Sequence, residues 1–272
     1  MFKSTYESLS FKNRIEESFV NLGLQIPDVF FYEITDSTNT RAKLYAEVQG
    51  DSISRPAIFF SHAQYAGRGT RGRSFESPTG GGVYISFLIT PKSDPFFSLR
   101  LTTLAAVSVC RAVKRISPDT DVRIKWVNDV TVSDKKLSGI LTEGKIEDGT
   151  VKYAIVGIGV NVSEAEHSPE VKAIMTSLSD IGIKTDADEF ATVLSEEFFI
   201  SLKDVTSDVI FSEYKALSSI LNRDITVTTT DGTRTEKAID IAPDFSLLTQ
   251  DENGNIHRYI SADVTVRPKT SV

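Results

Sequence analysis

The sequence predicts an α+β fold with a mixed, mostly antiparallel sheet, flanking helices and a small all-β module at its end. Three observations support this. The predicted strands of residues 1–221 follow one another mainly through hairpins, whereas a doubly wound parallel sheet places a helix between strands. Segments of helical length and period lie among these strands. Residues 222–272 change to short β-type runs, so we place a domain boundary near residue 221.

The individual elements are predicted from the spacing of apolar residues, close to 3.6 in helices and 2 in strands. Helical patterns cover residues 3–22, a segment that begins near Ser37, 99–116 and 186–220. Strand patterns cover residues 29–34, 57–62, 83–90, 122–126, 136–143 and 151–162. The dipeptide Asp148-Gly149 predicts a hairpin turn between the last two strands. Residues 1–33 form a helical extension before the rest of the first domain.

The helix near Ser37 has an expected orientation. Ser37 or Asp36 can act as its N-cap, because short polar side chains accept hydrogen bonds from the first free backbone amides. Leu44, Tyr45 and Val48 share one face of this helix. We expect that face to anchor the helix to the rest of the protein.

The composition excludes several classes of protein. A net charge of −7 and a pI of about 5.1 argue against the broad basic surface that non-specific nucleic-acid binding requires. Cys110 is the sole cysteine, which excludes an internal disulfide and a Cys-x-x-Cys metal cluster. The N-terminus lacks the apolar run of a signal peptide, and no segment reaches the ~18–20 apolar residues of a membrane span. We therefore expect a cytoplasmic protein without a membrane partner.

A polar, glycine-rich connection, residues 64–82, contains the heptapeptide GRGTRGR at residues 67–73. Its glycines allow the backbone to approach a ligand closely, and its arginines offer permanently charged donors to phosphate or carboxylate. The connection is also long, which favours a functional loop. Taken alone, the heptapeptide is equally compatible with an anion-binding loop and with a flexible loop of the type that binds single-stranded RNA.

Three further motifs carry polar or glycine residues near predicted strands. KWVND (125–129) precedes KKLSGIL (135–141), in which Lys136 could neutralise a carboxylate and a phosphate that approach each other. The alternatives are a strand-edge lysine that opposes aggregation and, for Asn128-Asp129, a plain turn. GIGVN (157–161) places two glycines in an apolar strand, which indicates either close approach of a ligand or backbone, or a β-bulge.

The order of these motifs is more informative than any one of them. DSTN, QYAGRGTRGR, SPTGGGVYIS, KWVND, KKLSGIL and GIGVN follow one another in an order and spacing that resembles the biotin protein ligases. The resemblance covers residues 34–162 by motif and residues 222–270 through the small C-terminal barrel of that family. It implies a class II synthetase-like catalytic domain (1–221) and a small SH3-like β-barrel (222–272).

The resemblance also implies an activity, that of a biotin–[acetyl-CoA-carboxylase] ligase. Such an enzyme uses ATP to convert biotin to biotinyl-5′-AMP, and then transfers biotin to a lysine of a biotin carboxyl carrier protein. ATP and biotin are the expected substrates, with Mg²⁺ held mainly by the ATP phosphates. We expect a monomer or weak homodimer whose partner is the carrier domain of a biotin-dependent carboxylase.

Site residues follow from the same resemblance. Lys136 would contact the biotin carboxylate and the adenylate phosphate, Arg68 the same anions, and Asp129 a metal or the incoming lysine. Ser37, Thr38, Asn39 and Gln64 would lie at the biotin ureido ring. The full set expected to bind biotin or the adenylate is Ser37, Thr38, Asn39, Gln64, Gly67, Arg68, Gly69, Thr70, Arg71, Asn128, Lys136, Gly159 and Asn161. Arg267 matches a C-terminal arginine that reaches the nucleotide.

The chain departs from the family pattern at three positions. Thr70 replaces the second arginine of GRGRxGR, which in the family helps to retain the reactive adenylate. We therefore expect weaker retention, or a loop that closes differently with Arg71 or Arg73 as substitute. Val127 replaces the proline of KWPND, and Phe75 replaces a tryptophan but can still cover biotin.

Two expectations separate this chain from its relatives. Regulatory members of the family carry an N-terminal winged helix-turn-helix domain, and the 33 residues before the ligase core are too few for one. We therefore expect no operator binding and no nucleic-acid partner. The alternative within the same fold is a lipoate ligase or octanoyltransferase. Cys110 lies in a predicted buried helix, which argues against a thiol nucleophile.

Overall fold

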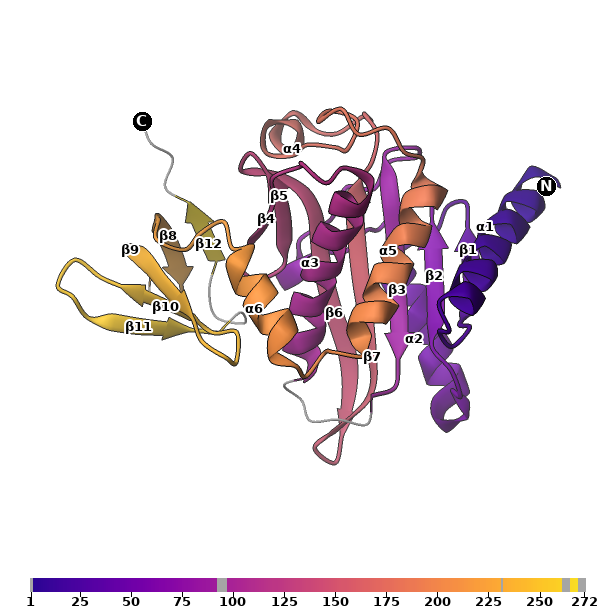
Figure 1. Ribbon diagram of the computed structural model, residues 1–272, viewed down its shortest axis with the longest axis horizontal. Coiled ribbons are helices and arrows are strands. Elements are labelled where there is room, and N and C mark those ends of the chain that lie inside the picture. Colours follow the sequence, from indigo (N-terminus) through magenta and orange to yellow (C-terminus); the bar gives the residue numbers. More distant parts are fainter. Residues whose placement is uncertain (1, 92–96, 231, 261–264, 269–272) are drawn as a thin grey trace.

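The computed structural model describes residues 2–91, 97–230, 232–260 and 265–268. Figure 1 shows a large sheet with helices on both faces and a smaller sheet beside it. The strands of the large sheet are β1 (Asp28–Tyr32), β2 (Ala57–Ser61), β3 (Gly82–Ile89), β4 (Val122–Lys125), β5 (Asp129–Val132), β6 (Lys135–Glu147) and β7 (Thr150–Asn161). Those of the smaller sheet are β8 (Asp224–Thr229), β9 (Gly232–Ile241), β10 (Leu247–Gln250), β11 (Ile256–Tyr259) and β12 (Thr265–Pro268). The α-helices are α1 (Phe2–Asn21), α2 (Thr38–Gln49), α3 (Phe97–Ile116), α4 (Pro169–Ile174), α5 (Ala187–Leu202) and α6 (Asp208–Ala216).

The seven strands of the large sheet have the order β1-β2-β3-β7-β6-β5-β4. β1 and β2 are parallel, and the other neighbours are antiparallel. The smaller sheet is antiparallel, with the order β11-β10-β9-β8-β12. The predicted fold class is therefore confirmed. The exact boundary at residue 221 stays a prediction, because the apolar core runs continuously from the large sheet into the smaller one.

A long hairpin, β6–β7, forms the centre of the large sheet. Its turn is at Asp148 and Gly149, which both have positive φ, 51° and 71°, as a tight hairpin turn requires. On one face α3 packs against β6, β7 and α5, and α5 packs in turn against α1. On the other face α2 packs over β2, β3 and β7. The part of β6 and β7 beside α2 is covered by a loop, and the candidate site lies there.

The orientation predicted for α2 is wrong for two of its three residues: Tyr45 packs against Phe30 and Phe59 as expected, but Leu44 and Val48 do not face the sheet. Leu44 and Val48 are 48% and 81% exposed. The side that faces the sheet is polar at its first turn and then small: Thr38, Asn39, Ala42 and Ala46. The alanines let the helix approach the sheet closely, and the polar residues find hydrogen-bond partners there. Ser37 occupies the predicted N-cap position, but its side chain makes no capping hydrogen bond.

Two short elements had no counterpart in the sequence prediction. β5 begins at Asp129, directly after a turn at residues 126–128, so the turn alternative for Asn128-Asp129 holds at Asn128; α4 lies in a segment without a clear pattern. Beyond β4, Trp126 donates its indole N–H to the backbone oxygen of Phe245, 2.9 Å away in the C-terminal module. Tyr214 on α6 donates to the backbone oxygen of Val127 at 3.0 Å. The first bond joins the C-terminal module to the large sheet, and the second joins α6 to it.

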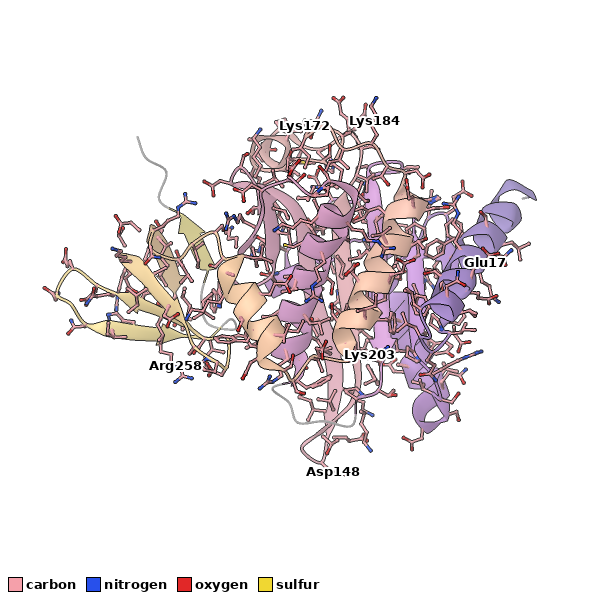
Figure 2. All side chains as sticks on the ribbon, in the orientation of Figure 1. Glu17, Asp148, Lys172, Lys184, Lys203 and Arg258 are labelled. Atoms are coloured by element: carbon pink, nitrogen blue, oxygen red, sulfur yellow. The ribbon has the colours of Figure 1, made fainter. Side chains whose placement is uncertain are left out.

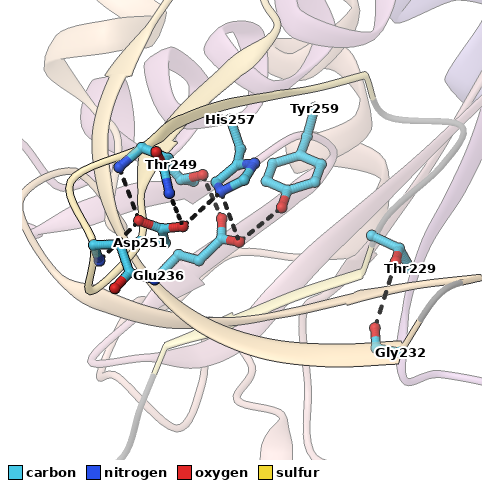
Figure 3. A network of polar contacts seen from close by, with 9 residues as sticks. Thr229, Gly232, Glu236, Thr249, Asp251, His257 and Tyr259 are labelled. Carbon is cyan, nitrogen blue, oxygen red and sulfur yellow. Dashed lines mark hydrogen bonds and ion pairs between the residues drawn. The ribbon is translucent and has the colours of Figure 1, made fainter.

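A buried carboxylate links the strands of the smaller sheet (Figure 3). Glu236 on β9 is 2% exposed and accepts hydrogen bonds from Thr249 at 2.5 Å and from Tyr259 at 2.9 Å. Burial, together with the bond to Glu236, raises the pKa of Tyr259 to about 12. Nearby, His257 lies 3.2 Å from Asp251. The network holds β9, β10 and β11 together.

Two buried serines of the large sheet should respond oppositely to replacement by alanine. Ser138 on β6 and Ser86 on β3 are both fully buried. The Ser138 hydroxyl has no hydrogen-bond partner among the described residues, whereas the Ser86 hydroxyl contacts Thr38 and Asn39. Removing a buried polar group that has no hydrogen-bond partner raises the free energy of unfolding. Removing a paired group leaves its partners without a hydrogen bond and lowers the free energy of unfolding.

We therefore expect Ser138→Ala to raise the free energy of unfolding by about 1 kcal/mol and Ser86→Ala to lower it by about 1–2 kcal/mol. Urea unfolding of the two variants and the parent protein measures both changes. A loss of stability in Ser138→Ala as large as that in Ser86→Ala would contradict the assignment of the Ser138 hydroxyl as unpaired.

Candidate active site

A pocket of about 260 Å³ lies on the sheet face that carries α2. Its walls are β6, β7, the start of α2, the loop of residues 64–82 and the segment that contains α4. The segment that contains α4 lies at the end of the molecule from which Lys172 projects in Figure 2. The predicted site residues that line the pocket are Ser37, Thr38, Asn39, Gln64, Arg68, Gly69, Thr70, Asn128, Asp129, Lys136, Gly159 and Asn161.

Of the three other predicted residues, one is placed differently and two stay predictions. Gly67 does not line the pocket, and a Cβ there would collide with the backbone oxygen of Phe75. Gly67 is therefore packed closely against the backbone of its own loop. Arg71 lies in the short 3-10 turn Thr70–Gly72 and Arg267 lies in β12, but their side chains are outside the described part of the chain.

The floor of the pocket is bare backbone. Gly139 on β6 and Gly159 on β7 are opposite each other in the sheet, and the Phe75 ring lies over both. A Cβ at Gly159 would come within 2.5 Å of the Phe75 ring, and one at Gly157 would collide with the Asn39 amide. The ladder is regular at Gly157 and Gly159, so these glycines reflect close approach by other side chains rather than a β-bulge.

One end of the pocket is a network of uncharged hydrogen-bonding groups. The backbone N–H and the hydroxyl of Thr38 donate to Gln64 Oε1 at 2.8 and 3.2 Å. Gln64 Nε2 donates to the Ser77 hydroxyl at 3.0 Å, which fixes the orientation of the amide. The Ser86 hydroxyl lies 2.7 Å from the Thr38 hydroxyl and 2.6 Å from Asn39 Oδ1. Side chains held in this way are preorganised to receive a polar, uncharged ring.

Glu143 does not line the pocket, but it holds two residues that do, Asn39 and Arg68, and the sequence analysis did not select it. One carboxylate oxygen accepts from Asn39 Nδ2 at 2.8 Å, and the other pairs with Arg68 at 2.8 Å. The side chains of Arg68 and Glu143 are 46% and 27% exposed, so solvent weakens the pair. Arg68 is therefore held by a protein carboxylate that an incoming anion could replace.

The other end of the pocket is built around Lys136. Its ammonium lies 2.6 Å from Asp129 Oδ1 and 5.7 Å from the centre of the Phe75 ring. Lys125 approaches the second Asp129 oxygen at 3.5 Å, so two cations share one carboxylate and the cluster keeps a net positive charge. β6 lies between β5 and β7, which excludes the strand-edge alternative for Lys136.

Two predicted asparagines support the backbone around Lys136. Asn128 Nδ2 donates to the backbone oxygen of Ile140 at 2.8 Å. Asn161 Nδ2 donates to the backbone oxygens of Lys136, at 3.3 Å, and Thr176, at 3.1 Å. Both side chains line the pocket, but their amide donors hold β6 and the segment after α4 in place.

The arginine-rich loop folds back on itself as a small hairpin. The backbone N–H of Gly69 donates to the backbone oxygen of Arg73 at 2.7 Å, and that of Phe75 donates to Gly67 at 2.9 Å. The Arg73 guanidinium lies 3.4 Å from both the hydroxyl and the backbone oxygen of Thr70. Thr70 thus faces the pocket and contacts one of the remaining arginines.

Glu76 connects this loop to the segment before α4. Its carboxylate accepts from the Ser168 hydroxyl at 2.6 Å and from the Ser168 backbone N–H at 3.0 Å, and it lies 3.2 Å from His167 Nδ1. These hydrogen bonds, the Ser168 hydroxyl first, hold the pKa of Glu76 below its ordinary value. The sequence offered no local signal for this contact, because Glu76 and His167 are far apart in the chain.

Comparison with protein families matches residues 31–161 to the Biotin/lipoate A/B protein ligase family. The "Biotin--[acetyl-CoA-carboxylase] ligase" of Paracoccus denitrificans is 31% identical over 169 residues, which are 60% of this chain and 68% of that protein. The "Bifunctional ligase/repressor BirA" of Bacillus subtilis is 32% identical over 181 residues, which are 64% of this chain and 54% of that protein. The chain thus spans about half the length of this bifunctional relative.

Solved structures are similar over most of the chain. A "Biotin protein ligase from Aquifex aeolicus in complex with biotin and ATP" has a TM-score of 0.73 and 26% identity, and the match covers 89% of this chain and 99% of that one. A biotin protein ligase from Leishmania major in complex with biotinyl-5-AMP has a TM-score of 0.60 at 21% identity, covering 86% of this chain and 99% of that one. The second comparison supports the fold alone.

Proposed function

The chain belongs to the biotin protein ligase family, and from this premise we propose that it is a biotin–[acetyl-CoA-carboxylase] ligase. Its substrates would be biotin, ATP and a lysine of a biotin carboxyl carrier domain. In the first step biotin becomes biotinyl-5′-AMP with release of pyrophosphate. In the second step the lysine takes the biotinyl group and AMP leaves.

The observation that carries this proposal is the two-ended pocket. Thr38, Asn39 and Gln64 offer an uncharged polar end, and Lys136 lies at the other end of the same glycine floor. Biotin has the matching asymmetry, with a neutral ureido ring at one end and a carboxylate at the other. Phe75, in the middle, would cover the apolar part of the molecule.

The first step brings two anions together. An oxygen of the biotin carboxylate attacks the α-phosphorus of ATP, a new O–P bond forms, and the bond to the pyrophosphate oxygen breaks. The main barrier is charge repulsion, so a fixed cation beside both groups lowers it. Lys136 fits this role because Asp129 holds its ammonium at the pocket wall. Arg68 can add a second cation once an anion replaces Glu143.

The second step needs a neutral amine. The carrier lysine attacks the carbonyl carbon of the mixed anhydride, a C–N bond forms, and AMP leaves with the electrons of the C–O bond. Asp129 is the pocket carboxylate beside Lys136, and we propose it as the partner of the incoming ammonium. The described residues contain no cluster of three or more metal-binding side chains, and we propose that Mg²⁺ enters with the ATP phosphates.

The polar end of the pocket also favours biotin over lipoate. The dithiolane ring of lipoate has no strong hydrogen-bonding group, and a site built from polar side chains rejects an analogue that leaves them unpaired. The Gln64 and Asn39 amides, which protein partners hold in place, would gain hydrogen bonds from a ureido ring and none from a dithiolane ring. Among the described residues, no helix combines the length and apolar character that crossing a bilayer requires.

The direct test is ATP-dependent labelling of a purified biotin carboxyl carrier domain, with biotin and lipoate in parallel. We expect labelling with biotin alone. Lys136→Met should slow it by about a hundredfold or more, because it removes the cation at the reacting groups. Lys135→Met is the matched control, because Lys135 is exposed and does not line the pocket. Labelling with lipoate alone would establish the alternative, and labelling with neither acid would refute both.

The replacement at Thr70 gives a second test. An arginine at this position adds charge-assisted hydrogen bonds to the adenylate phosphate, worth about 1.5–3 kcal/mol. Thr70→Arg should therefore slow the dissociation of biotinyl-5′-AMP by roughly tenfold or more. Rapid dilution of preformed, radiolabelled adenylate complex measures the rate. Thr70→Val, which adds no charge, should not slow it. Equal rates for Thr70→Arg and the parent protein would contradict the idea.

A further inference from the structure

One polar atom in the pocket wall has no role in the chemistry described above. The His167 side chain is 3% exposed and lines the pocket. Its Nδ1 faces Glu76, but its Nε2 is buried and has no hydrogen-bond partner among the described residues. An unpaired buried polar atom costs free energy, so its presence beside a binding pocket calls for a partner supplied by the ligand.

The contact with Glu76 determines what Nε2 can offer. The Glu76 carboxylate accepts two hydrogen bonds from Ser168, and its pKa is lowered, so it is ionised and can only accept. The proton of a neutral His167 ring must therefore lie on Nδ1. Nε2 is then a lone-pair acceptor. Glu76 thereby positions His167, and in the neutral ring the acceptor is Nε2.

The surroundings of His167 indicate what kind of group binds there. Val171, Ile174 and Met175 follow His167 in the chain and line the same pocket, so apolar side chains adjoin the imidazole, whose Nδ1 faces the Glu76 carboxylate. A phosphate, which is itself an acceptor, has no favourable contact with Nε2. A flat aromatic base with an exocyclic amino group fits both features, because its faces are apolar and its amine donates.

We propose that His167 Nε2 accepts a hydrogen bond from the 6-amino group of adenine, which makes His167 a determinant of nucleotide specificity. The proposal rests on the proposed use of ATP by this pocket. It assigns Glu76 a positioning role, because Glu76 sets the tautomer of the ring through Nδ1.

The test compares three triphosphates in biotin-dependent pyrophosphate release: ATP, purine riboside triphosphate, which lacks the 6-amino group, and inosine triphosphate, which carries an oxygen there. We expect the parent protein to prefer ATP in kcat/KM by about fivefold to tenfold over purine riboside triphosphate, the worth of one neutral hydrogen bond. Inosine triphosphate should be a poorer substrate still, because its 6-oxygen and His167 Nε2 are both acceptors and would face each other. In His167→Phe the ratio of ATP to purine riboside triphosphate should fall close to one.

Glu76→Gln provides a second variant that keeps the imidazole in place. The glutamine amide can donate to Nδ1 as well as accept from it, so the tautomer is no longer fixed and the preference for ATP should fall. An unchanged ratio in both variants would overturn the proposal, and so would a preference of the parent protein for inosine triphosphate. If the parent protein releases no pyrophosphate with any nucleotide, the proposed function itself fails.

Discussion

The site depends on the absence of side chains at three positions of the central hairpin. Gly139, Gly157 and Gly159 leave the β6–β7 surface bare, and the Asn39 amide and the Phe75 ring come directly against it. A single methyl group at Gly157 or Gly159 would displace one of these two residues. Asn39 in turn holds Glu143, so the polar end of the pocket and the arginine loop both depend on this close packing.

The charges of the pocket follow a second constraint, which is that Arg68 and Lys136 each have a protein carboxylate beside them. Arg68 pairs with Glu143 and Lys136 pairs with Asp129. The pairs keep the cations in fixed positions, and their partial exposure keeps the cost of exchanging one carboxylate for another low. Anionic substrates can thus enter a site whose cations are already oriented, which is the preorganisation that electrostatic catalysis requires.

The periodic spacing of apolar residues and the short motifs were sufficient to predict most of the fold and many of the pocket residues. Hairpin signals and strand periods predicted the antiparallel sheet, and the motif order selected pocket residues such as Lys136 and Gln64. The apolar period failed for Leu44 and Val48 of α2, which face solvent, while the polar first turn of the helix faces the sheet to meet Ser86 and Gln64. A period rule places apolar residues inside and has no means of recognising a buried polar network.

The residues that were missed are those whose importance comes from long-range contacts. Glu143 supports the pocket only because Asn39 and Arg68 reach it from distant segments. The period of two along β6 places Gly139, Leu141 and Glu143 on one face, and this was the signal that could have identified it. Glu76 and His167 lacked even that signal, because neither lies in a regular strand or helix.

The most direct measurement of the central claim is the affinity of Gly159→Ala for biotin, determined by calorimetry on protein whose fold is verified by urea unfolding. The account predicts binding at least about tenfold weaker, because the added methyl group displaces the Phe75 ring from the pocket floor. Gly149→Ala is the matched control: it strains the hairpin turn, whose φ is 71°, but does not touch the pocket, and it should bind biotin as the parent protein does. Unchanged biotin affinity in folded Gly159→Ala would contradict the claim that the site depends on a bare β6–β7 floor.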